Sequence, residues 1–153
     1  MIDRLIEKII EKENPSVVGL DTSFDYLPEN MRAGVKDFAG AAEAIVSFNR
    51  AVIDAVSDVV PAVKVQIAYY EMYGTEGLRA FSETCRYASE KGLIVMTDAK
   101  RNDIGATAEC YAKAYLGETA VGENSCEAFA SDFLTVNGYL GSDGIKPFLG
   151  WMQ

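Results

Sequence analysis

Residues 93–104 read Leu93-Ile-Val-Met-Thr97-Asp98-Ala-Lys100-Arg-Asn-Asp103-Ile104, a run of five apolar or β-branched residues that leads directly into charged residues. An unbroken run of this kind is typical of a strand buried on both faces of a parallel sheet. Side chains alternate along a strand, so Asp98 and Lys100 share a face if the extended backbone continues that far. Asp103 follows at the start of the next helical pattern. Two carboxylates and an ammonium are thus expected where a buried strand ends, which is the edge at which parallel α/β folds bind ligands.

The remaining sequence alternates between helical and strand patterns. Apolar spacing predicts helices over residues 2–12, 41–55, 74–91 and 104–115, and short apolar runs predict further strands over residues 17–20, 61–66 and 133–136. We expect a long connection over residues 23–40, a loop over residues 118–125 with room for a short helix after it, and a loop containing Pro147 after the last strand. This alternation predicts an α/β fold with parallel strands and right-handed crossovers.

The composition narrows the class of protein. The chain has 153 residues, enough for one domain with a core, and is 49% hydrophobic and 24% charged, as in ordinary soluble globular proteins. Its net charge of −9, without a basic run, argues against nucleic acid and anionic membrane surfaces as partners. The N-terminus begins a charged amphipathic helix rather than a signal peptide, and no long apolar span follows. We therefore expect a cytoplasmic protein.

The cysteine and histidine counts limit the chemistry. Cys85, Cys110 and Cys126 are odd in number and lack Cys-x-x-Cys spacing, and the chain has no histidine. This pattern argues against a zinc site and favours buried, reduced, inert thiols. Without histidine, a Ser-His or Cys-His nucleophile is excluded within this chain, and proton transfer falls to Asp, Glu, Lys, Tyr or Cys.

Lys64 interrupts the apolar run of the strand over residues 61–66. A lysine at such a place either extends to solvent or is paired with a carboxylate. Because Asp98 ends the next predicted strand, we expect the two side chains to pair.

Four segments of the chain are similar, in this order, to segments of one known family. They are Val17-Val-Gly-Leu-Asp21, Val63-Lys64-Val-Gln66, Asp98-Ala-Lys100-Arg-Asn-Asp103-Ile104-Gly-Ala-Thr107 and Thr135-Val-Asn137-Gly-Tyr-Leu-Gly-Ser-Asp-Gly-Ile-Lys-Pro-Phe148. The third segment carries the Asp-x-Lys-x-x-Asp signature of orotidine 5′-phosphate decarboxylase, and the chain resembles the longer-chain bacterial and archaeal branch of that family. The signature alone also occurs in related phosphosugar enzymes, whereas the four segments together are specific.

The resemblance implies a (β/α)8 TIM barrel in which residues 1–153 form the N-terminal half of a single barrel domain, about the first four βα units. The second half of the family's barrel, with its phosphate-binding loops, has no counterpart in this sequence. Four parallel strands alone leave two unpaired sheet edges and an uncovered inner face. We therefore expect a fragment of a longer enzyme that is inactive by itself; the alternative is that half-barrels associate to close the sheet.

The resemblance also implies catalytic roles. Lys100 is similar to the residue that protonates C6 of the substrate pyrimidine, and Asp98 to the carboxylate beside the departing carboxylate of orotidine 5′-monophosphate. Lys64 resembles the lysine that completes an alternating Lys-Asp-Lys-Asp chain and touches the ribose. Asp103 resembles the aspartate contributed across the interface of a homodimer with a shared active site.

Four further residues are implied as substrate contacts. Asp21 resembles a ribose or base contact and Asn137 a contact from the fourth strand, while Ile104 and Thr107 lie near the ligand of the neighbouring subunit. The substrate is a nucleotide monophosphate, and the family reaction requires neither a metal nor an organic cofactor.

Two other functions stay open. One is a magnesium-dependent phosphosugar lyase of the same superfamily, which uses the Asp-x-Lys-x-x-Asp cluster to stabilise an enediolate. The other is a non-catalytic half-barrel that dimerises or binds a ligand, which is compatible with the missing phosphate loops.

Overall fold

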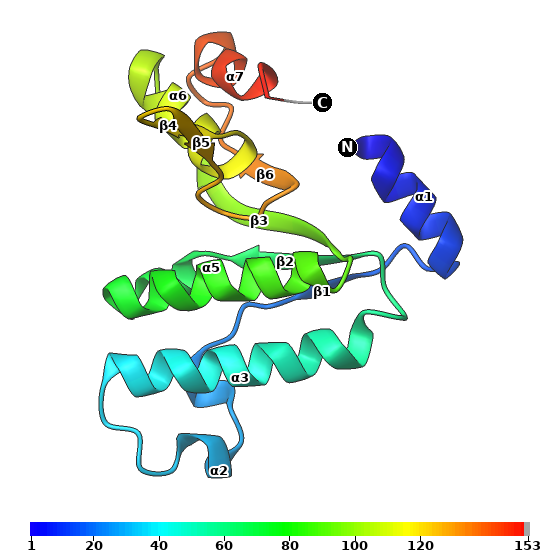
Figure 1. Ribbon diagram of the computed structural model, residues 1–153, viewed down its shortest axis with the longest axis vertical. Coiled ribbons are helices and arrows are strands. Elements are labelled where there is room, and N and C mark those ends of the chain that lie inside the picture. Colours follow the sequence, from blue (N-terminus) through cyan, green and yellow to red (C-terminus); the bar gives the residue numbers. More distant parts are fainter. Residues whose placement is uncertain (152–153) are drawn as a thin grey trace.

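The computed structural model describes residues 1–151 and contains a four-stranded parallel sheet. The strands are β1 (Val17–Gly19), β2 (Ala62–Gln66), β3 (Ile94–Arg101) and β6 (Phe133–Val136), in the spatial order β1-β2-β3-β6. Sequence order and spatial order agree, as expected of successive right-handed βα units. β1 and β6 lie at the two edges of this sheet (Figure 1).

Eight helical segments accompany the strands in the described part of the chain. They are α1 (Ile2–Lys12), η1 (Phe24–Tyr26), α2 (Glu29–Arg32), α3 (Phe38–Val56), α4 (Ala68–Glu71), α5 (Gly74–Glu90), α6 (Gly105–Leu116) and α7 (Ser142–Leu149). A small antiparallel hairpin, β4 (Thr119–Val121) and β5 (Asn124–Cys126), stands apart from the main sheet. Helices α3 and α5 run alongside each other next to the sheet (Figure 1).

The core lies between the sheet and these two helices. Asp37 caps α3 by accepting a hydrogen bond from the backbone of Gly40 at 2.9 Å, and the apolar face that follows is buried. Val63 and Val65 of β2 point into this core, whereas Lys64 and Gln66 lie on the opposite, partly open face of the sheet. Near its carboxyl end, β2 therefore presents polar side chains on the open face and valines to the helices.

A buried polar hub ties the loop after β1 to the helices. Asn49 accepts a hydrogen bond from Thr22 at 2.7 Å and donates to the hydroxyls of Tyr70 and Thr84 at 2.8 and 3.2 Å. Tyr70 in turn donates to the carbonyl of Leu20 at 3.0 Å. Buried polar groups that are fully hydrogen-bonded specify geometry. The hub thus fixes the loop directly after the first strand.

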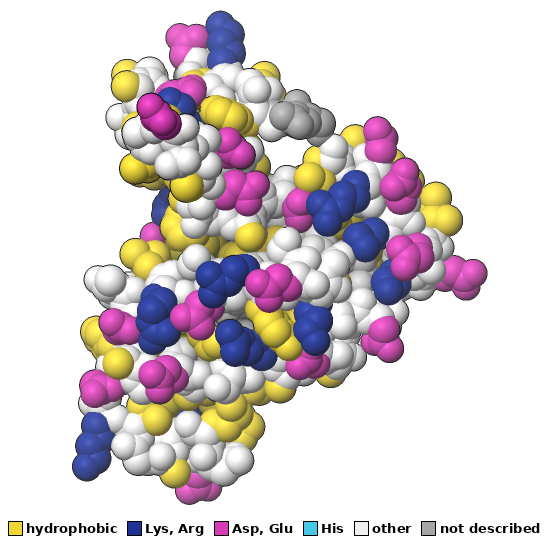
Figure 2. All heavy atoms as spheres, viewed as in Figure 1, with side chains coloured by type: hydrophobic (Ala, Val, Ile, Leu, Met, Phe, Trp, Pro, Cys, Tyr) yellow, Lys and Arg dark blue, Asp and Glu magenta, His cyan; other side chains and the backbone are white. Residues whose placement is uncertain are grey.

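The outer surface over α3 and α5 is an ordinary solvated one. Figure 2 shows charges of both signs interspersed there, and Arg79 forms ion pairs with Glu76 and Glu83 on the same helix. Exposed pairs of this kind add little to stability. In the described part of the chain, none of the helices has the length and apolar character needed to cross a membrane.

Several expectations about local structure were wrong. Residues 119–126 form the hairpin β4–β5 rather than a loop followed by a short helix. The long connection expected after the first strand is present, but it contains the short segments η1 and α2 and ends where α3 begins at Phe38. Helix α7 includes Pro147, where a loop was expected, because Phe148 packs against Ala108 and Ala112 of α6. Tertiary packing outweighs the missing backbone hydrogen bond.

The expectation of three buried thiols holds for one cysteine. Cys85 is fully buried in the core, while Cys110 and Cys126 are exposed. Cys110 lies on the face of α6 opposite Ala108 and Ala112, and Cys126 lies on the hairpin, which is exposed along its length. The presence of a cysteine in the sequence does not by itself show whether its side chain faces the core or the solvent.

Candidate active site

The strand register brings polar residues of three strands to one end of the sheet. Gln66 is paired with Asp98 in the β2–β3 ladder, and Gly19 is paired with Lys64 in the β1–β2 ladder. Because side chains two residues apart share a face, Lys64 and Asp98 point the same way, and Asp21 follows on the same side of the first strand. This end is the carboxyl end of the parallel strands, as the sequence predicts.

Four charged side chains form a row there, which we call the charge row: Asp21, Lys64, Asp98 and Lys100. Lys64 Nζ lies 3.0 and 3.2 Å from the two carboxylate oxygens of Asp21 and 3.3 Å from Asp98 Oδ2. Lys100 Nζ lies 2.6 Å from Asp98 Oδ1. The charges therefore alternate in sign along the row. The pairing of Lys64 with Asp98 that was expected from the sequence is confirmed.

Lys100 reaches Asp98 by a route that the sequence did not predict. Its backbone is left-handed, with φ of 51°, and the β3–β6 ladder shifts register between Thr97 and Arg101. The extended backbone on which the shared face of Asp98 and Lys100 was conditional therefore does not continue through Lys100, because the ladder is irregular there. The bulge turns the side chain of Lys100 back toward Asp98 and leaves it 63% exposed.

Two uncharged residues that were given no role complete the surroundings of Asp98. Gln66 Nε2 donates to Asp98 Oδ2 at 2.8 Å, and the hydroxyl of Thr135 donates to Asp98 Oδ1 at 2.7 Å. The side chain of Asp98 is 12% exposed, so these donors matter for keeping its charge. Gln66 could have been found from the ladder register, whereas Thr135 is distinguished in the sequence only as a hydroxyl in a short apolar strand.

The contacts within the row keep Asp98 and Lys64 ionised against the cost of burial. Burial raises the pKa of Asp98, but hydrogen bonds from Lys100, Thr135 and Lys64 outweigh it and hold that pKa below its usual value. Burial likewise lowers the pKa of Lys64, and its contacts with Asp21 and Asp98 more than compensate, so this pKa is raised. Each partner thus stabilises the charged form of the other.

The other predicted site residues lie outside the row. Asp103 accepts a hydrogen bond from the backbone N–H of Ile104 at 2.8 Å, and Ile104 and Thr107 are exposed at the start of α6. Asn137 accepts a hydrogen bond from the backbone of Tyr139 at 2.9 Å and is also exposed. Their roles in substrate binding stay predictions.

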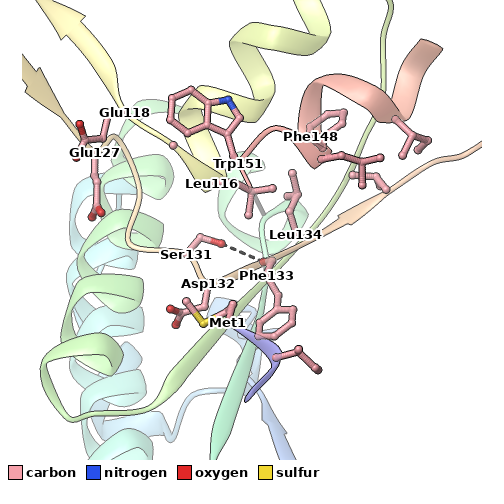
Figure 3. A pocket seen from close by; sticks show the side chains of 15 residues that line it. Met1, Leu116, Glu118, Glu127, Ser131, Asp132, Phe133, Leu134, Phe148 and Trp151 are labelled. Atoms are coloured by element: carbon pink, nitrogen blue, oxygen red, sulfur yellow. Dashed lines mark hydrogen bonds between the residues drawn. The ribbon is translucent and has the colours of Figure 1, made fainter. Parts of the chain in front are cut away.

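A cavity of about 800 Å³ lies elsewhere, along the β6 edge of the sheet. Figure 3 shows Leu116, Leu134, Phe148 and Trp151 on its apolar side, with Glu118 and Glu127 near each other at its rim. No member of the charge row lines it. Among residues 1–151 we find no cluster of three or more His, Cys, Asp or Glu side chains suited to hold a metal ion.

Comparison with known proteins gives one consistent family. The profile described as "Orotidine 5'-phosphate decarboxylase / HUMPS family" matches residues 36–151. Curated proteins named orotidine 5'-phosphate decarboxylase from Clostridium novyi and Clostridium acetobutylicum are 43% and 44% identical over 153 residues, the whole chain. That alignment covers 49% of each relative, so the chain spans about half the length of the curated relatives that it matches.

The solved structures agree with the sequence relatives. OMP decarboxylase from Leishmania donovani matches 96% of this chain with a TM-score of 0.70 and 27% identity, using 49% of its own length. The predicted fold, an α/β half-barrel of the TIM-barrel class, is confirmed, and so is the resemblance to an N-terminal half.

Proposed function

Because this chain belongs to the orotidine 5'-phosphate decarboxylase / HUMPS family, we propose that it supplies the charged half of an active site that converts orotidine 5′-monophosphate to uridine 5′-monophosphate. The proposal treats residues 1–153 as the N-terminal half of one barrel domain in a cytoplasmic enzyme of de novo pyrimidine biosynthesis. The observation that carries it is the charge row, in which Lys64 and Lys100 flank the low-exposure carboxylate of Asp98.

The reaction needs a fixed positive charge beside one carbon. When the bond between C6 and the carboxylate breaks, the electron pair stays in an sp² orbital at C6 that the ring cannot delocalise. An ammonium held in place lowers the energy of this carbanion, and the effect grows several-fold as the effective dielectric constant falls from about 80 to about 20. Lys100 provides that ammonium and then donates a proton from Nζ to C6, which gives the product and a neutral amine that solvent reprotonates.

The neighbouring carboxylate acts before the bond breaks. Asp98 stands where the substrate carboxylate would be repelled, and the repulsion disappears as carbon dioxide leaves. Its lowered pKa keeps it ionised for this role. Lys64, paired on both sides, is placed to contact the ribose, with Asp21 beside it.

The remaining predicted residues are assigned to a homodimer with a shared site. Asp103, Ile104 and Thr107 would approach the substrate of the neighbouring subunit, and the exposure of Ile104, at 60%, leaves it free for such a contact. Asn137 is assigned to the subunit's own substrate. The substrate phosphate would be bound by the half of the barrel that this chain does not span.

The experiment is a turnover assay of the 153-residue chain, alone and mixed with the separately expressed C-terminal half of a curated relative. We expect conversion of orotidine 5′-monophosphate in the mixture, unaffected by a chelator, and loss of at least about a thousandfold on Lys100→Ala. Lys113→Ala, which removes an exposed lysine paired at 3.8 Å with Glu109, is the matched control and should leave the rate unchanged.

Three outcomes would contradict the proposal: no turnover in the mixture, turnover that depends on magnesium, or substantial activity retained by Lys100→Ala. Magnesium dependence would indicate the phosphosugar lyase function instead. The shared site has its own test, since mixing folded Lys100→Ala and Asp103→Ala proteins should restore some activity through heterodimers, and no recovery would refute a site built from two subunits.

A further inference from the structure

Thr135 lies at the junction between the backbone of Lys100 and the carboxylate of Asp98. Its Oγ1 accepts a hydrogen bond from the backbone N–H of Lys100 at 3.0 Å and donates one to Asp98 Oδ1 at 2.7 Å. We propose that Thr135 is a positioning residue, whose hydroxyl sets the direction in which Lys100 presents its ammonium to Asp98 and to the reacting carbon. The link to the reacting carbon rests on the proposed function, whereas the link to Asp98 does not.

The ladder explains why Lys100 needs such a partner. Thr97 and Arg101 are paired with Leu134 and Val136, so residues 98–100 of β3 stand opposite the single residue Thr135 of β6. The extra residues form the bulge, and the left-handed backbone of Lys100, with φ of 51°, is one that side chains other than glycine rarely adopt. Its N–H lies outside the regular ladder, and the hydroxyl of Thr135 supplies the acceptor.

The bonds on either side of Lys100 hold the bulge at its ends. The guanidinium of Arg101 donates to the carbonyl of Ala99 at 3.3 Å and to Glu71 at 2.9 Å, and the carbonyl of Arg101 accepts from the backbone of Asn137 at 3.0 Å. These contacts fix residues 99 and 101. The hydrogen bond to Thr135 then fixes the orientation of the peptide N–H of Lys100, which lies between them.

The direction of each hydrogen bond follows from the donors available. An ionised carboxylate only accepts, so the single hydroxyl proton of Thr135 goes to Asp98, and the hydroxyl oxygen is left to accept from Lys100. Asp98 Oδ1 also accepts a hydrogen bond from Lys100 Nζ at 2.6 Å. The three hydrogen bonds therefore form a closed ring through Lys100 N, Thr135, Asp98 and Lys100 Nζ. The ring joins both the backbone N–H and the ammonium of Lys100 to the carboxylate of Asp98.

A purely structural role would be filled equally well by valine. Thr135 is exposed on an edge strand, and valine has nearly the same shape with a higher preference for strands. The Thr135→Val variant should therefore fold, while it can neither accept from Lys100 nor donate to Asp98. Thr135→Ser keeps both hydrogen bonds and provides the rescue.

The first test is made on the 153-residue chain by NMR, which needs no turnover. The carboxyl of Asp98 faces Lys64 and Gln66 from β2, Lys100 from β3 and Thr135 from β6, with Asp21 beyond Lys64. Because the hydroxyl of Thr135 lowers the pKa of this carboxyl, its titration should move to higher pH in Thr135→Val. The amide hydrogen of Lys100 should exchange about tenfold faster or more.

In Thr135→Ser, the titration of Asp98 should return to that of the unaltered protein. The exchange rate of the Lys100 amide hydrogen should return to within about threefold of the unaltered rate. An unchanged Asp98 titration and unchanged Lys100 exchange in Thr135→Val would overturn the proposal. If that variant is unfolded, Thr135→Ala removes the hydroxyl without a branched side chain, and the same two readings decide.

The second test uses the reconstituted turnover assay. Misplacing the ammonium should lower kcat by about 10- to 100-fold in Thr135→Val with KM changed by no more than about threefold, and Thr135→Ser should recover most of kcat. Equal losses in both variants, or a change in KM alone, would refute a positioning role. Absence of turnover in the unaltered mixture would instead refute the proposed function, and the NMR comparison would still decide whether Thr135 sets the ammonium.

Discussion

Replacing Lys64 with methionine removes the ammonium that lies between two carboxylates while keeping a side chain of similar length. The pair with Asp98 spans 3.3 Å and the pair with Asp21 spans 3.0 Å. Two unit charges at about 4 Å attract by about 1 kcal/mol in bulk water and about 4 kcal/mol at an effective dielectric constant of about 20. These values set an upper limit for the attraction within each ion pair, and exposure to solvent lowers it.

The exposures decide where in that range the effect falls. The side chains of Lys64 and Asp21 are 34% and 40% exposed, so their pair contributes at most about 0.5 kcal/mol after screening. Asp98 is 12% exposed and keeps Gln66, Lys100 and Thr135, so losing Lys64 weakens but does not isolate its charge. We expect Lys64→Met to lower the free energy of unfolding by about 1–2 kcal/mol at pH 7.

The assay is a double-mutant cycle, which isolates the pair from other effects of each substitution. Urea unfolding of Lys64→Met, Asp98→Asn and the double variant should give a coupling energy of about 1 kcal/mol or more. The control cycle uses Lys113 and Glu109, a pair on α6 at 3.8 Å with both side chains more than 40% exposed, which should give about 0–0.5 kcal/mol. A coupling between Lys64 and Asp98 no larger than the control would refute the claim that the row is held by its alternating charges.

Three further predictions concern stability and reactivity. Gly77→Ala should lower the free energy of unfolding by about 2–3 kcal/mol in thermal denaturation, because the new Cβ would collide with the carbonyl oxygen of Tyr70, whereas Gly138→Ala, in open space, should change it by less than about 0.5 kcal/mol. The stabilising effect of an ionised Asp98, measured against Asp98→Asn, should be constant above about pH 5 and decline as the pH falls below 3.8, since its folded pKa is lower than its unfolded one. Burial raises the pKa of Cys85 to about 12, so a thiol reagent at pH 8 should label the two exposed cysteines of the folded protein and reach Cys85 only after denaturation.

The fold was predictable because its long elements carry clear periodicity. The 11-residue helix α1 and the 19-residue helix α3 show apolar residues at helical spacing, and the four strands of the main sheet follow short apolar runs. The hairpin β4–β5 was missed because its residues are exposed on both faces and so leave no alternation to detect. Helix α7 was missed because packing on α6, rather than local sequence, permits Pro147 inside it.

The site was predictable to the extent that strand neighbours determine it. Lys64 and Asp98 lie toward the carboxyl ends of adjacent parallel strands, on the same face and two residues apart in register, so their pairing could be expected from the sequence. The left-handed backbone of Lys100 could not be predicted, because it lies at a shift in the β3–β6 register. Thr135, which accepts the hydrogen bond from its N–H, lies 35 residues later in the chain. Local sequence rules assign an extended backbone to such a residue, and a long-range ladder overrides them.

Asp103 makes none of the contacts that form the charge row, which is compatible with its proposed assignment to a neighbouring subunit. The carbonyl of Arg101 is bonded to the fourth strand, Asn102 packs so closely on α7 that a Cβ at Gly144 would overlap its side chain, and the carboxylate of Asp103 accepts from the N–H of Ile104. None of these contacts joins Asp103 to a member of the charge row. The ammonium of Lys100 is left with Asp98 on one side and 63% of its side chain exposed, so the alternation of charge along the row ends on a cation. Under the proposed homodimer, Asp103 of a second copy is the carboxylate that would continue the alternation.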